Sequence, residues 1–143
     1  MKTIQQLIGD KGSQVWSIGP DASVYDALVL MAEKQIGALL VMDDSGMIGL
    51  ISERDYARSV ILRGRTSKET HVRDVMTKRV VCTKPDQTLE EAMALMTEKR
   101  VRHLPVIADG KVVGLISIGD LIKSIISEHK FIIEQLEHYI SSG

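Results

Sequence analysis

The chain has 143 residues, 44% of them hydrophobic and 26% charged, with a formal net charge of −1, so it lacks the basic excess typical of nucleic-acid-binding proteins. Its longest apolar run, residues 36–42, is too short to cross a bilayer, and its amino-terminal residues do not resemble a signal peptide. A single cysteine, Cys82, excludes an internal disulfide and suits a reducing compartment. We therefore expect a cytoplasmic protein that binds neither nucleic acid nor membrane.

The first half of the chain predicts a strand, a helix, a hairpin and a second helix, after a short apolar turn. Ser23 and Asp26 have the spacing of a helix-capping pair, and the apolar residues that follow recur at helical spacing. A turn at residues 43–46 joins two β-rich runs, as in a hairpin. In order, we expect an apolar turn at residues 4–8, a strand at 15–18, a helix from residue 24, strands at 36–42 and 47–52, and a helix at about 54–62.

The same order of elements returns after a charged, turn-rich linker. The linker, residues 64–79, contains a short helical piece at about 72–76. Beyond the last of these elements, apolar residues at intervals of four indicate an amphipathic helix. Its length and apolar stripe fit equally well with folding back on its own domain and with packing on a partner subunit. In the second half we expect a strand at residues 80–83, a helix from residue 89, strands at 101–107 and 112–117, a helix at about 119–127, and the amphipathic helix at 128–143.

These two halves are a duplication. The heptapeptide Gly-Leu-Ile-Ser-x-x-Asp occurs twice, 65 residues apart, and a shift by this distance aligns residues 15–61 with 80–126 without a gap. Each half is close to the size at which a core becomes marginal, so we expect the halves to fold against each other as an α/β domain. The predicted boundaries are residues 1–63 for the first repeat, 64–79 for the linker, 80–127 for the second repeat and 128–143 for the carboxyl-terminal helix.

The duplicated segment permits a structural and a functional interpretation. Ser52 with Asp55, and Ser117 with Asp120, have the spacing of a capping box, which requires no ligand. A carboxylate in the first turn of a helix, beside a hairpin, also offers two acceptor oxygens to the two hydroxyls of a ribose. The same helix start attracts phosphate, so each copy is a candidate nucleotide site.

The whole pattern resembles the cystathionine-β-synthase (CBS) domain family, and within it the small stand-alone CBS pairs. The resemblance covers about residues 3–127 and rests on the Pro-Asp pairs at 20–21 and 85–86, on the run Arg-His-Leu-Pro-Val at 102–106, and on both heptapeptides. It implies two β-α-β-β-α repeats with pseudo-twofold symmetry, a homodimer, and two clefts for adenosine nucleotides. Family ligands include AMP, ADP, ATP, S-adenosylmethionine and NAD(H).

The resemblance also implies roles for residues at the matching positions. The aspartates of both heptapeptides would bind ribose hydroxyls, and their serines a ribose or phosphate oxygen. Arg102 and His103 would meet phosphate, while Met76 and Val81 would line the adenine. The predicted nucleotide-binding residues are Ser52, Arg54, Asp55, Arg58, Met76, Val81, Arg102, His103, Leu104, Pro105, Ser117 and Asp120.

The repeats differ where phosphate would bind. The first hairpin has Gly37 and Ala38 at the positions of the basic pair, so it offers no phosphate ligand of its own. Its following helix instead carries Arg54 and Arg58, where the second repeat has glycine and lysine. We therefore expect two unlike clefts, one preferring a mononucleotide such as AMP and the other accepting a dinucleotide such as NAD(H).

Other reactive residues support no competing site. Cys82 has no histidine near it in sequence, and the four histidines lack metal-ligand spacing, so we predict neither an enzyme nor a bound metal. Trp16, which aligns with Val81, is expected in the core, with adenine stacking as the alternative. The main hypothesis is a regulatory module that senses energy or redox state through an adenosine nucleotide and signals to a partner protein. A structural dimerisation module with silent clefts, and a less favoured enzyme acting on the nucleotide, are the alternatives.

Overall fold

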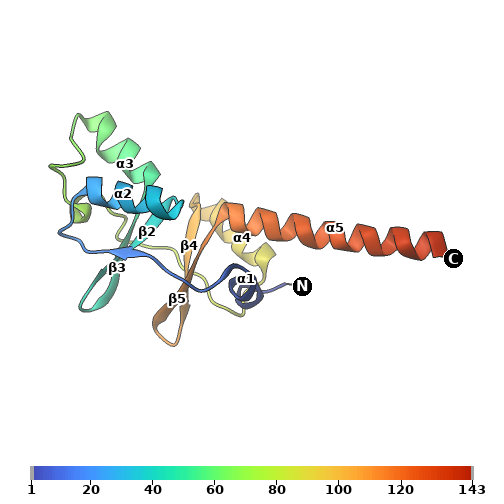
Figure 1. Ribbon diagram of the computed structural model, residues 1–143. Helices are drawn as coiled ribbons and strands as arrows, with labels where there is room; N and C mark the ends of the chain where they lie inside the picture. The colour runs from blue at the N-terminus through green and yellow to red at the C-terminus, as the bar shows by residue number, and fades with distance from the viewer. Residues whose placement is uncertain (1, 143) are drawn as a thin grey trace.

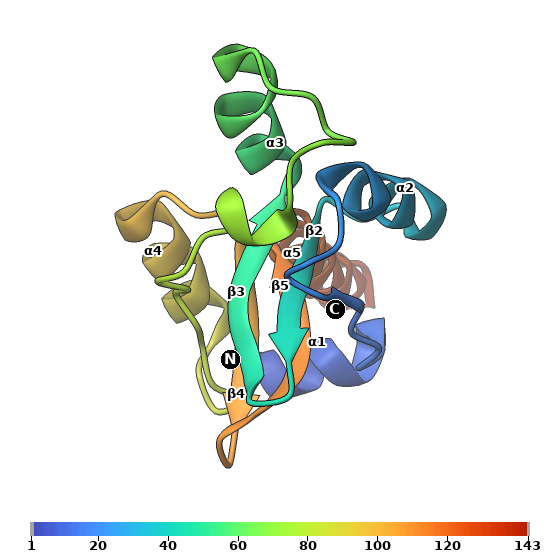
Figure 2. The same ribbon diagram turned by 90° about the vertical axis from the view of Figure 1, so that its left-hand side faces the viewer.

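The computed structural model describes residues 2–142 and contains two neighbouring β-hairpins surrounded by helices (Figures 1 and 2). Figure 2 shows the hairpin of the first repeat in front of that of the second. The α/β fold expected from the sequence is confirmed. The elements are α1 (Ile4–Lys11), β1 (Ser17–Ile18), α2 (Val24–Lys34), β2 (Ala38–Asp43), β3 (Gly46–Ser52), α3 (Glu53–Ser59), 3₁₀ turns at Ile61–Arg63 and Val72–Asp74, α4 (Leu89–Lys99), β4 (His103–Ala108), β5 (Lys111–Ser117) and α5 (Ile118–Ser142).

Side-chain caps begin the helices as the sequence predicts. The Thr88 hydroxyl accepts a hydrogen bond from the Glu91 amide, and the Glu91 carboxylate accepts one from the Thr88 amide, which completes a capping box. At α2, Ser23 accepts from the amide of Asp26. The predicted apolar turn at residues 4–8 is a full helix, α1, whose own capping box is formed by Thr3 and Gln6.

The two sheets differ by one strand. In the first, β1 pairs in parallel with β2, and the Leu40 amide donates to the Trp16 carbonyl at 3.2 Å. The expected strand at residues 80–83 is reduced to an isolated bridge between Thr83 and Val106. The physical reason is Pro105, which occupies the position of Leu40 in the second repeat and has no N–H to donate.

The hydrophobic residues form two clusters, and each cluster recruits a segment from outside its own repeat. Ile4 and Leu7 of α1 pack with the buried residues of α4, β4 and β5, so the amino-terminal helix belongs to the core of the second repeat. Val72 and Val75, from the connection between the repeats, pack with the core of the first. The repeats are therefore tied together by exchange of their flanking segments.

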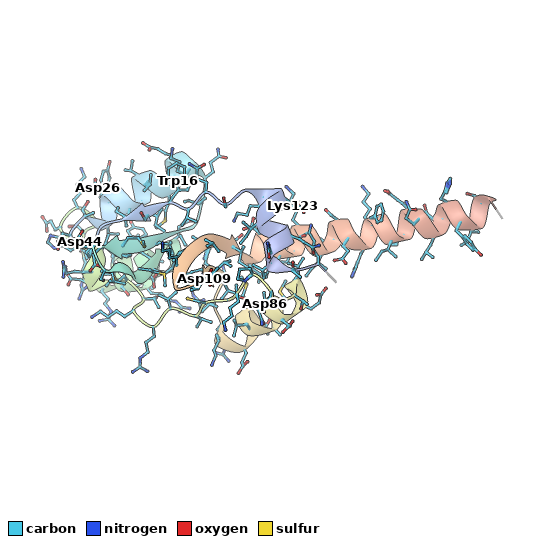
Figure 3. The ribbon with its side chains drawn as sticks, turned by 90° about the horizontal axis from the view of Figure 1, so that it is seen from below. Trp16, Asp26, Asp44, Asp86, Asp109 and Lys123 are labelled. Atoms are coloured by element: carbon cyan, nitrogen blue, oxygen red, sulfur yellow. The ribbon has the colours of Figure 1, made fainter. Side chains whose placement is uncertain are left out.

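The carboxyl-terminal residues form one long helix instead of two. α5 begins within the second repeat, is 25 residues long, and projects away from the body (Figure 1). Leu121 and Ser124 are buried, whereas every described side chain from residue 129 onward is exposed. Along the projecting part of the helix the side chains stand out around it (Figure 3), so the helix does not fold back on its own domain. Among the described helices, none is both long and apolar enough to span a membrane.

Candidate functional site

A cavity of about 500 Å³ lies where the start of α3 faces the residues that precede β4. We call it the arginine cleft, because Arg54 and Arg58 of the first repeat line it together with Arg79, Arg100 and Arg102. Its remaining wall includes the apolar side chains of Val80, Val81 and Val101. Both repeats contribute to this one cavity.

Asp55 lines the arginine cleft, and one of its two carboxylate oxygens is already engaged. Oδ2 accepts hydrogen bonds from the Ser52 amide at 2.9 Å and the Ser52 hydroxyl at 3.0 Å, and the Ser52 hydroxyl accepts from the Asp55 amide. The capping-box interpretation of this spacing is thus confirmed. Among the described residues, only the Thr77 hydroxyl donates to Oδ1, at 3.3 Å, which is long for such a bond, so this carboxylate oxygen has remaining capacity.

The second cavity, of about 400 Å³, surrounds Asp120. We call it the lysine cleft, because Lys11, from the end of α1, lines it with Asp120, Trp16 and Ser117. The Lys11 ammonium donates to the Asp120 carboxylate and, at 2.7 Å, to the Leu115 carbonyl. The Lys11 ammonium is therefore already bound to the Asp120 carboxylate, which the sequence predicts to bind a ribose.

The surroundings of Asp120 keep it ionised. Burial raises its pKa, but hydrogen bonds from Lys11 and Ser117 and the positive charge of Lys11 outweigh burial and hold the pKa below its ordinary value of 3.8. The Ser117 amide donates to Oδ2 at 2.8 Å, and the Ser117 hydroxyl accepts from the Asp120 amide at 3.1 Å. This second Ser-x-x-Asp segment is also a reciprocal cap.

His103 lines both clefts. A Cβ atom at Gly37 would lie 3.5 Å from its Nε2 and 3.0 Å from Oε1 of Glu53, so the glycine leaves room for the imidazole. Burial is the main cause that lowers the pKa of His103 below 6.5; Lys11 and Arg102 lower it further, and the carboxylates of Asp120 and Asp55 oppose this. The ring is therefore neutral at pH 7.

The structure brings nine of the twelve predicted residues to a cleft. The remaining three are placed elsewhere: Leu104 is fully buried in the core, Pro105 is buried within β4, and the Met76 side chain packs beside Gly49. The arginine cleft contains Ser52, Arg54, Asp55, Arg58, Val81, Arg102 and His103, and the lysine cleft contains His103, Ser117 and Asp120.

The basic residues of the two repeats line one cavity, which the comparison of the two repeat sequences did not predict. The basic helix of the first repeat and the basic hairpin of the second face one another across a single cavity, so Arg54 and Arg58 share a cleft with Arg102. The first repeat's Asp55 thus has the more basic surroundings, although its own hairpin has none of these groups.

Sequence reasoning did not identify Lys11, Thr77, Arg79 or Arg100 as site residues. Lys11 is 109 positions from Asp120, and no local pattern links them. Trp16 packs against the core of the first repeat, as expected, and also lines the lysine cleft; adenine stacking stays a prediction. The Lys34 ammonium lies 4.1 Å from the centroid of its ring.

Two duplicated α/β repeats, each closing with a capped aspartate at the edge of a shared cavity, define a tandem CBS pair. The family profile described as "CBS domain" matches residues 12–61 and 72–127, and the chain belongs to this family.

Individual relatives are small CBS proteins. The chain is 39% identical over 137 residues to CBSX3, a mitochondrial CBS domain-containing protein of Arabidopsis thaliana, covering 92% of this chain and 66% of CBSX3. It is 31% identical to YhcV of Bacillus subtilis, covering 76% of this chain and 77% of YhcV. Among solved structures, the CBS domain NE2398 is 50% identical with a TM-score of 0.84, covering 87% of this chain and 98% of that one. A proposed signal-transduction protein with CBS domains from Burkholderia ambifaria is also 50% identical, with a TM-score of 0.85 and coverage of 88% and 95%.

Proposed function

We propose that this protein is a regulatory module that binds an adenosine nucleotide, from the group AMP, ADP, ATP and NAD(H), and signals to a partner protein. The observation that carries the proposal is Asp55, whose Oδ1 has acceptor capacity in a cavity lined by arginines and by apolar side chains. The ribose would donate to Asp55, the adenine would lie against Val81, and the phosphates would meet the arginines. Asp120 is the less available of the two aspartates, because Lys11 already pairs with it.

Regulation would follow from the composition of the arginine cleft. A ligand held by both repeats binds more tightly to one relative position of the repeats than to another, and it therefore shifts the population towards that arrangement. The second repeat continues directly into α5, so a change in its position is carried to the projecting helix. Homodimers formed through α5 would present this change to a partner, and we propose that they do so in the cytoplasm.

The test is nucleotide binding measured by equilibrium dialysis with AMP, ADP, ATP and NADH. We expect Asp55→Ala to weaken binding about tenfold or more, because a hydrogen bond to a charged group is lost. Asp44→Ala is the matched control, since Asp44 is exposed and lines neither cleft. Undiminished binding by a folded Asp55→Ala variant would refute the proposal.

A structural dimerisation module is the second candidate, and the exposed apolar side chains of α5 favour it. Thermal unfolding separates the two, because a ligand at a hundred times its dissociation constant stabilises the fold by about 2.7 kcal/mol and a silent cleft gives no shift. We propose no catalysis: both aspartates serve as caps, and burial raises the pKa of the Cys82 thiol, which disfavours a nucleophilic thiolate. Product analysis after incubation with each nucleotide tests this.

A further inference from the structure

The arginine cleft has more positive charge than a single phosphate group needs. Its five arginines outnumber its two carboxylates, Glu53 and Asp55, by three, with His103 neutral. A phosphate monoester carries about two negative charges at neutral pH. A bound mononucleotide such as AMP would therefore leave the cleft positively charged.

These arginines are also unpaired within the described part of the chain. Its ion pairs join Lys2 to Asp10, Lys11 to Asp120 and Arg73 to Asp21, and none involves an arginine of the cleft. Of the five, Arg54 has a hydrogen bond in the structure, to the Arg100 carbonyl at 3.1 Å. Guanidinium groups gathered without carboxylate partners repel one another, and a bound polyanion would relieve that repulsion.

The hydrogen-bonding geometry of arginine also favours a ligand with more than one phosphate group. A guanidinium presents two parallel N–H groups to two phosphate oxygens, and the three terminal oxygens of one phosphate cannot engage five such forks. The arginines of the cleft come from three separate segments: α3, the linker residue Arg79 and the residues before β4. A chain of phosphates can reach several of them.

The lysine cleft provides the internal contrast. Lys11 is the one lysine or arginine among its described lining residues, and its charge is balanced by Asp120. Its other walls are mainly neutral, including Trp16, Ile36 and Ala38. The excess charge therefore belongs to one cleft and is not a general property of the fold.

We infer that the arginine cleft selects a nucleotide carrying two or three phosphates in a row, such as ADP or ATP, over a nucleoside monophosphate. This inference rests on the proposed function, because it takes Asp55 as the ribose ligand and assigns the phosphate chain to the arginines. It narrows the ligand class of that same site.

Calorimetric titration of the full chain with adenosine, AMP, ADP and ATP, at low and at moderate salt and without divalent metal, tests the inference. We expect affinity to rise along the series, with ATP at least about tenfold tighter than AMP, because each added phosphate gains charged hydrogen bonds. Salt should weaken ATP binding more than AMP binding. Equal or tighter binding of AMP would overturn the inference while leaving the proposed function intact.

A pair of matched variants assigns the effect to the cleft. Arg58→Gln with Arg79→Gln should reduce ATP affinity about tenfold or more and AMP affinity less. Arg63→Gln with Arg65→Gln removes the same net charge from exposed positions outside the cleft and should leave the ATP preference unchanged. An ATP preference that survives in the cleft variant, or that falls equally in both, would overturn the inference.

Two further measurements separate this inference from the proposed function. Inorganic tripolyphosphate should bind more weakly than ATP, and Asp55→Ala should weaken ATP but not tripolyphosphate. If tripolyphosphate binds as tightly as ATP and Asp55→Ala has no effect on either, the cleft is a polyanion site and the adenosine-binding proposal fails. If no compound binds, both fail.

Discussion

Single residues decide how the two clefts differ. Asp55 and Asp120 occupy equivalent positions and make equivalent caps, yet Lys11 pairs with Asp120, whereas none of the described ion pairs involves Asp55. The difference arises from one side chain at the end of α1. Availability of the carboxylate, and not the motif itself, therefore distinguishes the clefts.

Replacing Lys11 should open the lysine cleft to a ribose. In Lys11→Met, adenosine, which has no phosphate to gain from the lysine, should bind Asp120 more tightly, by about tenfold, because no ammonium competes for the carboxylate. Calorimetry in an Asp55→Ala background isolates this site. Lys2→Met, which breaks the other ion pair of α1 at 2.7 Å, is the control and should have no such effect. Unchanged adenosine affinity in Lys11→Met would show that the pair does not exclude the ligand.

His103 should make stability depend on pH. Because burial lowers its pKa in the folded state, the unfolded chain binds the proton more readily, and this residue's contribution to stability rises with pH up to about its unfolded value of 6.5. The loss of stability caused by protonating His103 is complete below its pKa in the folded state and absent above its pKa in the unfolded state. Urea unfolding between pH 5 and 7.5 should therefore show a smaller pH dependence for His103→Gln than for wild type. His71→Gln, at an exposed position, should keep the wild-type dependence.

At the scale of elements, the glycines of the duplicated segment permit close approach between strands and flanking segments. A Cβ at Gly49 in β3 would lie 2.7 Å from Met76 Sδ and 2.9 Å from the Thr77 carbonyl oxygen. That carbonyl accepts from the Leu50 amide at 3.0 Å, so it cannot move without loss of the bridge. In β5, a Cβ at Gly114 would lie 2.9 Å from Cδ1 of Ile8.

Gly49→Ala should therefore destabilise the protein by about 1–3 kcal/mol through overpacking. Gly9→Ala is the matched control, because apart from its chain neighbours and the backbone of its own helix no atom lies within 4 Å of its added Cβ. Alanine also favours the helix interior, which should stabilise α1 by up to about 1 kcal/mol. Chemical unfolding of both variants checks the pair. Equal stability of Gly49→Ala and wild type would mean that residues 76–77 can move away from the added methyl group without destabilising the fold.

At the scale of the whole molecule, the main feature is an exposed apolar stripe on α5. Ile126, Ile133 and Ile140 recur every seven residues and are 60%, 54% and 75% exposed, and Ile122 and Leu136 lie beside them at coiled-coil spacing. Isoleucine at one core position of a heptad favours pairing of two parallel helices. A second copy of the chain is thus a fitting partner for this stripe.

Sedimentation should show a dimer that Ile126→Glu with Ile133→Glu converts to a monomer, because charges would be buried in the seam. The matched control, Ser127→Glu with Gln135→Glu, adds the same charge outside the stripe and should remain dimeric. A dimer that persists in the isoleucine variant would place the interface elsewhere, and a monomeric wild type would refute the pairing.

What the sequence determined by itself is mostly local or periodic. The helix caps, the hairpins and the capped aspartates at residues 55 and 120 follow from residues three or four apart and from a repeat of fixed length. The shortening of the second sheet also has a cause in the sequence, because Pro105 lacks the N–H that Leu40 donates in the first sheet. This effect becomes apparent only when the two sheets are compared.

The tertiary structure decided which repeat each flanking segment joins and which side chains share a cavity. The packing of α1 on the second repeat brings Lys11 to Asp120, and the pseudo-twofold arrangement collects arginines from both repeats around Asp55. It also left α5 extended, although its apolar spacing alone was equally compatible with folding back. The physical reason is that burial of apolar surface and pairing of charges join residues a hundred positions apart, and neither leaves a trace in local spacing.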